Sequence, residues 1–98
     1  MKKLVLDINK LEMAAGRLRA IAHPMRIAII SLLDQQKKLS VTEIYTAIDI
    51  EQASASHHLN ILKTKGVLVS KREGKKILYS LKNEILSEII DCINRCNE

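Results

Sequence analysis

The sequence has almost no aromatic residues: no Phe, no Trp, and only Tyr45 and Tyr79 among 98 residues. Hydrophobic residues still make up 47% of the chain, so its core must be aliphatic. The length suits one domain, which we expect to span residues 1–98. A domain of this size buries a modest fraction of its surface, and a second copy of the chain would add buried area.

The sequence also has little that would indicate secretion or membrane insertion. The N-terminal Met-Lys-Lys-Leu-Val-Leu begins like a secretory signal, but Asp7 ends its apolar run. No stretch approaches the roughly 20 apolar residues of a membrane span. The two cysteines, Cys92 and Cys96, lie close together near the C-terminus and form no disulfide framework. We therefore expect a cytoplasmic protein without a membrane partner.

The motifs of an enzyme are also missing. The sequence has no Gly-rich phosphate loop, no paired acids in an evident cleft, and no ordering of Ser, His and Asp that a fold would assemble. We expect no enzymatic activity.

Apolar residues at helical spacing predict helices in the first two thirds of the chain. His23-Pro24 breaks the first pattern, because Pro disfavours helix in the preceding residue and suits the first turn of a new helix. Ser40 or Thr42 caps a third helix, and Gly66 ends a fourth. The predicted helices span residues 7–21, 24–33, 41–48 and 52–65, and the second gives way to the polar residues 34–38.

The pattern then changes from helical to alternating. Two short runs of alternating apolar residues flank a Gly-containing turn at 72–75 and predict a β-hairpin: Val67 and Val69, then Ile77, Tyr79 and Leu81. A fifth helix is predicted over 83–96. The fold class is mainly α with a small β-hairpin, a winged helix-turn-helix with five helices in the order ααααββα, which we expect to be dimeric.

The third and fourth helices form the expected helix-turn-helix, in which the second helix enters the DNA major groove. Its outer arc carries small polar side chains, and Gln and Ser are residue types that bond base edges. An ordinary solvated helix face is the alternative interpretation. We expect base contacts from Gln52, Ser54, Ser56 and His57, with a base or phosphate contact from Asn60.

The hairpin is strongly basic. Between Lys63 and Lys82 the chain has seven basic residues and one acid, Glu73, within a net charge of +5 for the whole chain. A basic hairpin directly after a helix-turn-helix suits contact with phosphates of double-stranded DNA. We expect phosphate contacts from Lys71, Arg72, Lys75 and Lys76, helped by Thr42.

Several motifs in this order give the chain a family resemblance. They are Ala-His-Pro-Met-Arg-Ile at 22–27, Ser-His-His-Leu at 56–59 with Leu62, Gly-Val-Leu-Val at 66–69, Arg-Glu-Gly-Lys at 72–75 and Tyr-Ser-Leu at 79–81. With them the chain resembles the ArsR/SmtB-type family of bacterial repressors along almost its whole length. The resemblance implies a dimer built from the first and last helices, repression by blocking promoter DNA, and often a releasing effector.

Some positions match the family's pattern and others depart from it. His58 matches a histidine that usually belongs to the family's scaffold, which leaves His57 as the exposed one. Glu51 stands where the family often has a capping Ser or Thr. At the start of the third helix, where metal sensors of the family often carry Cys-x-Cys, this chain has Ser40 and Thr42.

The family's second type of metal site uses carboxylates and histidines of the last helix, and residues 83–98 contain no histidine. We therefore expect no metal and no other cofactor, and the effector stays unknown. Cys92 and Cys96 are four residues apart, on one helical face. They are either ordinary small residues near a chain end, a thiol-based redox or persulfide switch, or a soft-metal site shared by two subunits.

These observations predict a sequence-specific homodimeric repressor that binds an inverted-repeat operator. The alternative is a winged-helix protein-interaction module without specific DNA binding, which would expose apolar residues on its fourth helix, where Ile61 is the only large one. Dimer contacts are expected from apolar residues of the first and last helices: Ile8, Leu11 and Leu18 with Ile85, Ile89 and Ile93.

Overall fold

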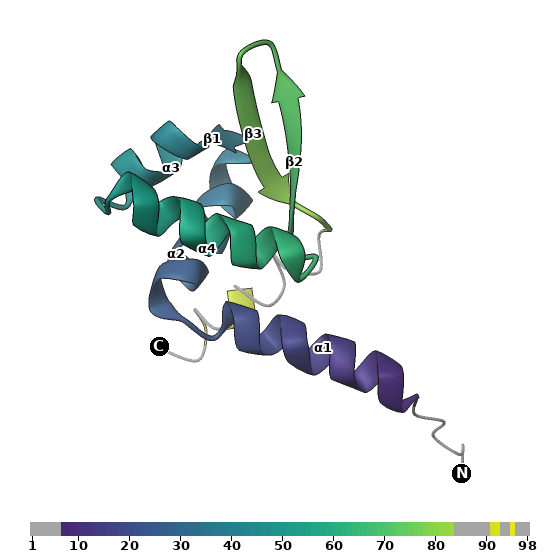
Figure 1. Cartoon of the computed structure of the whole chain (residues 1–98). Helices are drawn as coiled ribbons and strands as arrows, with labels where there is room; N and C mark the ends of the chain where they lie inside the picture. Colours follow the sequence, from purple (N-terminus) through teal and green to yellow (C-terminus); the bar gives the residue numbers. More distant parts are fainter. Residues whose placement is uncertain (1–6, 84–90, 93–94, 96–98) are drawn as a thin grey trace.

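The computed structural model describes residues 7–83, 91, 92 and 95 (Figure 1). Within them the chain folds into four helices and a three-stranded antiparallel sheet. The elements are α1 (Ile8–Ile21), α2 (Pro24–Gln36), β1 (Leu39–Ser40), α3 (Val41–Ala47), α4 (Gln52–Thr64), β2 (Leu68–Glu73) and β3 (Lys76–Leu81). The order of four helices followed by a hairpin confirms the predicted mainly α winged helix-turn-helix.

The first two helices begin at residues whose side chains satisfy free backbone N–H groups. The Asp7 carboxylate accepts a hydrogen bond from the N–H of Asn9 at 2.9 Å. Nδ1 of His23 accepts one from the N–H of Met25 at 3.1 Å, and Pro24 starts α2. The extended backbone of His23 is the conformation that a following Pro favours, so α1 and α2 are separate helices, as predicted.

Local signals also fix the start of α3 and the end of α4. Ser40 and Glu43 form a capping box at the start of α3, with hydrogen bonds of 3.2 Å and 3.0 Å. This geometry selects Ser40, of the two predicted caps, as the residue before the first turn. Gly66 follows α4 with φ of 75°, a left-handed conformation that Gly adopts without a steric penalty.

The core is aliphatic, as the composition requires. It joins the inner faces of α2, α3 and α4 to the base of β2, with the end of α1 added. Its buried residues are Ala20, Ile21, Ile29, Ile30, Leu33, Ile44, Leu59, Leu62, Val67 and Leu68. Burial of such side chains contributes about 25 cal/mol per Å² of apolar surface, and it holds the helix-turn-helix against the sheet.

The strand β1 is absent from the sequence prediction. It pairs antiparallel with β3, with Leu39 opposite Tyr79 and Ser40 opposite Leu78, and the strand order is β1-β3-β2. A strand of two residues is too short to show an alternating pattern, so only the hairpin could be predicted. β1 ties the start of α3 to the middle of β3.

The hairpin β2–β3 is the wing, and it rises beyond the helices (Figure 1). Its strands pair from Leu68–Leu81 to Glu73–Lys76, which leaves a two-residue turn at Gly74 and Lys75. Gly74 has φ of 64°, as the first residue of a type II′ turn requires.

The two runs of alternating apolar residues are not uniformly buried. Val67 and Leu68 are both buried, whereas Val69 and Ile77 are exposed. Because successive side chains of a strand point to opposite faces, Val69 points away from the buried side chain of Leu68. Ile77 lies one pair from the turn, near the tip of the wing. The alternation therefore predicts the strands and not the burial of each residue.

The predicted fifth helix lies mostly outside the described residues. Asn83 is in a bend, and residues 91, 92 and 95 have helical backbone conformation. The expected dimer contacts from Ile85, Ile89 and Ile93, and the role of Cys96, fall outside the residues that the structure describes. No helix within the described part of the chain is long and apolar enough to cross a membrane.

Candidate nucleic-acid interface

A tight turn connects α3 to α4 and forms a helix-turn-helix. The N–H of Ile50 donates to the carbonyl of Tyr45 at 3.1 Å, and Asp49 adopts a left-handed φ of 55°, which Asp tolerates better than most residues. Glu51 precedes α4 without a side-chain cap hydrogen bond. The departure from a capping Ser or Thr therefore leaves the first N–H groups of α4 without that partner.

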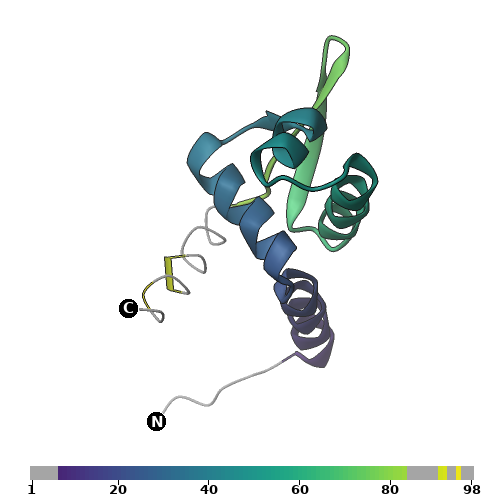
Figure 2. The same ribbon diagram turned by 90° about the vertical axis from the view of Figure 1, so that its left-hand side faces the viewer.

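One side of α4 is buried and the other is open to solvent (Figure 2). The buried side consists of Ala55, His58, Leu59 and Leu62. All five residues predicted to contact bases are exposed: Gln52, Ser54, Ser56, His57 and Asn60. Ile61 is half-buried against the core, so α4 exposes no large apolar side chain. This surface suits hydrogen bonding to base edges better than an apolar protein partner.

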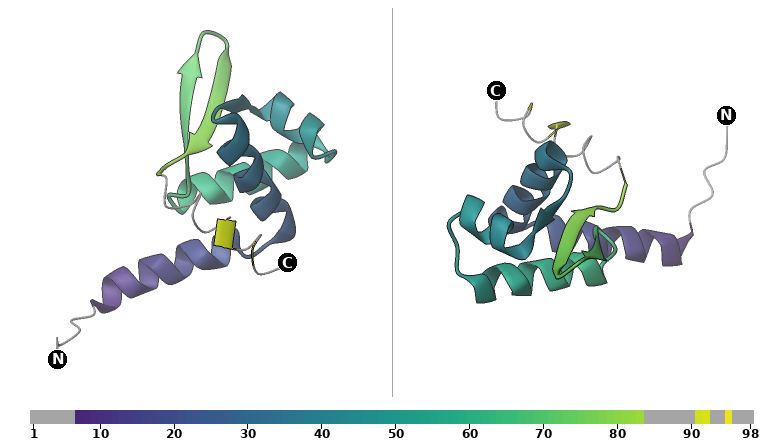
Figure 3. Two further views of the ribbon diagram at one scale, coloured as in Figure 1. Left: turned by 180° about the vertical axis from the view of Figure 1, so that it is seen from behind. Right: turned by 90° about the horizontal axis from the view of Figure 1, so that it is seen from above.

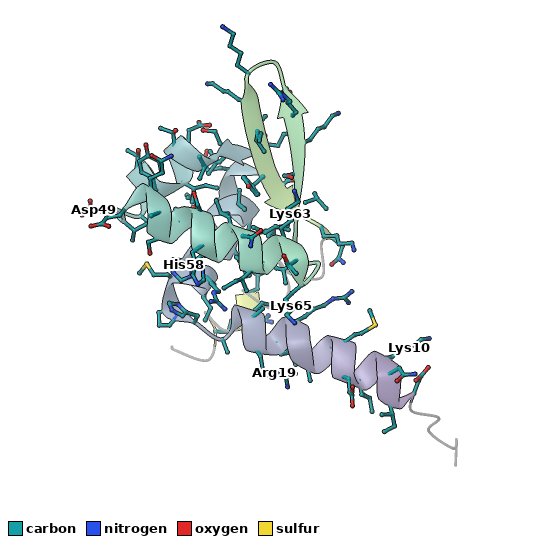
Figure 4. All side chains as sticks on the ribbon, viewed as in Figure 1. Lys10, Arg19, Asp49, His58, Lys63 and Lys65 are labelled. Carbon is teal, nitrogen blue, oxygen red and sulfur yellow. The ribbon has the colours of Figure 1, made fainter. Side chains whose placement is uncertain are left out.

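His58 belongs to the scaffold, as the family resemblance implies. It is buried beneath α4, toward the start of α2 (Figure 4), and its Nδ1 accepts a hydrogen bond from Nε of Arg26 at 3.1 Å. Nη1 of the same Arg26 donates to the carbonyl of Ala20 at 3.2 Å. Arg26 thus connects α2 both to the end of α1 and to the middle of α4. This contact between distant segments fixes α4 relative to the helices behind it.

The three histidines of the chain lie in a row. The His58 ring centroid is 4.7 Å from that of His23 and 5.8 Å from that of His57. Burial of His58 lowers its pKa, and the neighbouring His23, Arg26 and His57 lower it further. The buried ring is therefore neutral at pH 7, with Nδ1 free to accept the Arg26 hydrogen bond.

A cleft of about 490 Å³ lies between the start of α3, the exposed side of α4 and the wing. Its lining includes Thr42, Ser56, Lys75 and Lys76, so residues predicted separately as base and phosphate contacts meet at one place. Lys71 and Arg72 are exposed on β2, and Arg72 donates to the Gly74 carbonyl at 3.3 Å. The cleft joins the helix surface to the basic wing.

Two acids near this surface are held by partners that the sequence did not indicate. Glu73, the one acid of the basic segment, pairs with Lys38 at 3.2 Å. Glu43 lines the cleft, and the hydrogen bond from the backbone N–H of Ser40 lowers its pKa, with smaller effects from the Ser40 side chain and Lys76. Because Lys38 neutralises Glu73, this acid offsets less of the positive charge of the wing.

The positions of the family's Cys-x-Cys metal ligands are filled by residues with other roles. Ser40 is buried in the capping box, and Thr42 is exposed on the predicted DNA side. Within the described residues no group of three or more His, Cys, Asp or Glu side chains is arranged to hold a metal ion. Cys92 is exposed as a free thiol. The thiol switch and the soft-metal site considered for Cys92 and Cys96 stay predictions.

The helix α1 extends away from the other helices (Figure 3). The side chains of Ile8, Leu11 and Leu18 are 66%, 44% and 57% exposed. With Ala15 they fall at spacings of three and four residues, which places them on one face of the helix. This exposed apolar stripe contains the three α1 residues that were predicted to contact a second subunit.

Comparison with known proteins places these features in a family. Residues 21–70 match a family described as a helix-turn-helix domain. The transcriptional repressor PagR of Bacillus anthracis is 36% identical over 89 residues, which cover 91% of this chain and 89% of PagR. The crystal structure of PagR superposes with a TM-score of 0.82 over 89% of this chain and 99% of that chain.

Two further proteins are similar to the chain. The transcriptional regulator NmtR of Mycobacterium tuberculosis is 35% identical over 86 residues, which cover 88% of this chain and 71% of NmtR. A solution structure of the winged helix-turn-helix DNA-binding domain Mb0332 of Mycobacterium bovis, described as homodimeric, has a TM-score of 0.83 and 25% identity. That match covers 99% of this chain and 89% of the other.

The fold and the exposed polar side of α4 define a winged helix-turn-helix DNA-binding regulator. The chain belongs to the ArsR/SmtB-type family of transcriptional regulators. Its relatives are regulators of transcription rather than enzymes.

Proposed function

We propose that this protein is a cytoplasmic homodimeric repressor that binds an inverted-repeat operator in double-stranded DNA. Two copies of α4 enter successive major grooves, about 34 Å apart along the duplex. Gln52, Ser54, Ser56 and His57 contact base edges, with Asn60 as a further base or phosphate contact. The wing, helped by Thr42, holds phosphates. Occupation of a promoter in this way blocks transcription.

The convergence of polar and basic residues at one cleft supports the proposal most directly. Ser56 of α4, Thr42 of α3 and Lys75 and Lys76 of the wing line the same cleft. A surface that presents hydrogen-bonding groups beside exposed cations matches the two kinds of contact in a protein–DNA interface, base edges and phosphates. The absence of a large exposed apolar residue on α4 argues against the protein-interaction alternative.

The exposed stripe on α1 supports the dimer. Ile8, Leu11 and Leu18 form a continuous apolar face on a helix that projects from the rest of the chain. A second copy of the same stripe would remove this apolar surface from water. The homodimeric Mb0332 domain, with a similar fold, is consistent with that assembly.

The affinity for a random-sequence duplex, measured at several salt concentrations, distinguishes DNA binding from the alternative of a protein-interaction module. Because phosphate contacts release counterions, the dissociation constant should rise steeply with salt, with a slope of about 0.9 per contact in a log–log plot. A Lys75→Gln, Lys76→Gln variant should lower that slope, and Lys37→Gln, outside the cleft, should leave it unchanged. Absence of salt-dependent duplex binding would favour the protein-interaction module.

A further inference from the structure

A second basic groove lies at the other end of α4, between that end and α1. Four basic side chains line it together with one acid, Glu12, and its volume is about 630 Å³. The residues that line it are Asn9, Glu12, Met13, Gly16, Arg17, Arg19, Thr64, Lys65, Gly66 and Lys82. Figure 4 shows Lys65 at the junction of α4 and α1. The predicted DNA contacts of the wing and of α4 do not include these residues.

Two cations in this groove meet over Gly66. A Cβ atom built at Gly66 would lie 3.6 Å from Nη2 of Arg17 and 3.6 Å from Nζ of Lys82, so the two charges are neighbours. Nε of Arg17 donates to the carbonyl of Lys65 at 3.3 Å, which fixes the guanidinium and leaves its Nη groups available. Within residues 7–83 neither cation makes an ion pair. Neighbouring like charges repel, and a bound anion would relieve that repulsion.

The groove is continuous with the recognition side of α4. At about 100° per residue, Asn60 and Thr64 lie within about 40° of each other on the exposed side of the helix. Thr64 also lines the groove. Figure 1 shows α4 between the wing above and α1 below. A duplex whose major groove accepts α4 would therefore have the wing beside one wall and this groove beside the other.

The Arg17 side of the groove stays open in the proposed dimer. At about 100° per residue, Arg17 lies at least about 100° around α1 from each of Ile8, Leu11 and Leu18 of the apolar stripe. A second subunit packed on the stripe would therefore leave Arg17 accessible.

We propose that Arg17 and Lys82, with Lys65, bind a backbone phosphate of the DNA strand opposite the one held by the wing. This proposal rests on the proposed function. It adds to the DNA interface Arg17 of α1 and Lys82, which directly follows β3 at the base of the wing. Arg is suited to the role because its planar guanidinium can donate two hydrogen bonds to one phosphate. Such contacts position α4 in the groove and carry no base information.

The test compares charge-removing variants in a salt titration of duplex binding. Lys82→Gln should lower the log–log salt slope by about one, and Arg17→Gln with Lys82→Gln by about two. At about 0.15 M salt the double variant should bind roughly 10- to 30-fold more weakly, by a similar factor for operator and random duplex. Lys37→Gln removes the same charge outside both clefts and is the control. Lys82→Gln alone guards against loss of the packing contact that Arg17 makes.

The outcomes separate this proposal from the function on which it rests. If the native protein binds DNA with a steep salt slope and the double variant matches Lys37→Gln, the phosphate contact is overturned and the proposed function stands. If the native protein shows no salt-dependent binding, both fail. NMR of the Gly66 amide during titration with inorganic phosphate adds a third arm. Saturation there, with unchanged DNA slopes, would make the groove a site for a small phosphorylated ligand and overturn the DNA contact.

Discussion

At the scale of single residues, Arg26 and His58 hold α4, the proposed recognition helix, in place. The hydrogen bond between them joins residues that are 32 positions apart, and it requires His58 to be neutral at Nδ1. A proton on that nitrogen would remove the acceptor and place a second positive charge beside Arg26. The position of α4 is therefore linked to the ionisation of one buried ring.

Stability should consequently decrease in mild acid. The folded state holds the pKa of His58 below its ordinary value of 6.5, mainly through burial. Its contribution to stability is thus complete above about pH 6.5 and is lost as the pH falls through the lowered pKa. Urea unfolding at a series of pH values should show this loss, with a slope of at most about 1.4 kcal/mol per pH unit from this group.

The control for that measurement is His58→Gln, whose amide oxygen can accept a hydrogen bond from Arg26 but does not titrate. Its free energy of unfolding should vary less with pH over the same interval. Equal pH dependence in the native protein and His58→Gln would show that His58 is not the group responsible.

The residue before α4 offers a gain in stability. Glu51 makes no side-chain cap hydrogen bond, whereas a Ser at this position accepts one from an N–H of the first turn. Glu51→Ser should raise the free energy of unfolding by roughly 0.5–1 kcal/mol, reduced by loss of a negative charge near the helix N-terminus. Chemical denaturation checks the value, and Glu51→Ala, which cannot cap, should show no gain. Equal stability of the Ser and Ala variants would contradict the capping explanation.

At the scale of elements, the wing and the recognition helix should contribute differently to binding. Asn60→Ala should weaken operator binding by about 1–3 kcal/mol if Asn60 contacts a base, with little effect on random duplex or salt slope. Lys75→Gln with Lys76→Gln should weaken both duplexes and lower the salt slope by about two. Fluorescence anisotropy at several salt concentrations measures both quantities. Loss of operator preference in the wing variant alone would reverse the assigned roles.

Local patterns in the sequence account for most of the elements. The starts of α1, α2 and α3 and the end of α4 follow from Asp7, Pro24, Ser40 and Gly66, because those signals act within a few positions. The end of α2 was predicted wrongly, because the helix continues to Gln36 through the polar residues at which it was expected to end. The two-residue β1 carries no periodicity, and burial along the wing depends on which face of β2 packs on the core. The sequence therefore predicted that Val69 and Ile77 lie in strands and not that they are exposed.

The candidate site was predicted in the same uneven way. Exposure of Ser56, His57 and Asn60 follows from helical geometry once the buried face of α4 is known. Contacts between distant segments were not predictable, because no local pattern records them. The Lys38–Glu73 pair and the approach of Arg17 to Lys82 over Gly66 are of this kind.

At the scale of the whole molecule, the dimer depends on the apolar stripe of α1. Leu11→Glu places a charge in that stripe, and burying an unpaired carboxylate against a second copy is costly. Sedimentation equilibrium should show the native chain as a dimer and Leu11→Glu as a monomer. Met13→Glu, at a position 60% exposed on another face of α1, should remain a dimer. Identical masses for the two variants would exclude the stripe as the contact.

The central claim is that two copies of this chain recognise one operator through their α4 helices. Selection of bound duplexes from a random pool, at about 150 mM salt where weak nonspecific binding is suppressed, tests it most directly. The account predicts recovery of an inverted repeat whose half-sites are one helical turn apart, centre to centre. Recovery of no common sequence, or of a single unrepeated site, would contradict it.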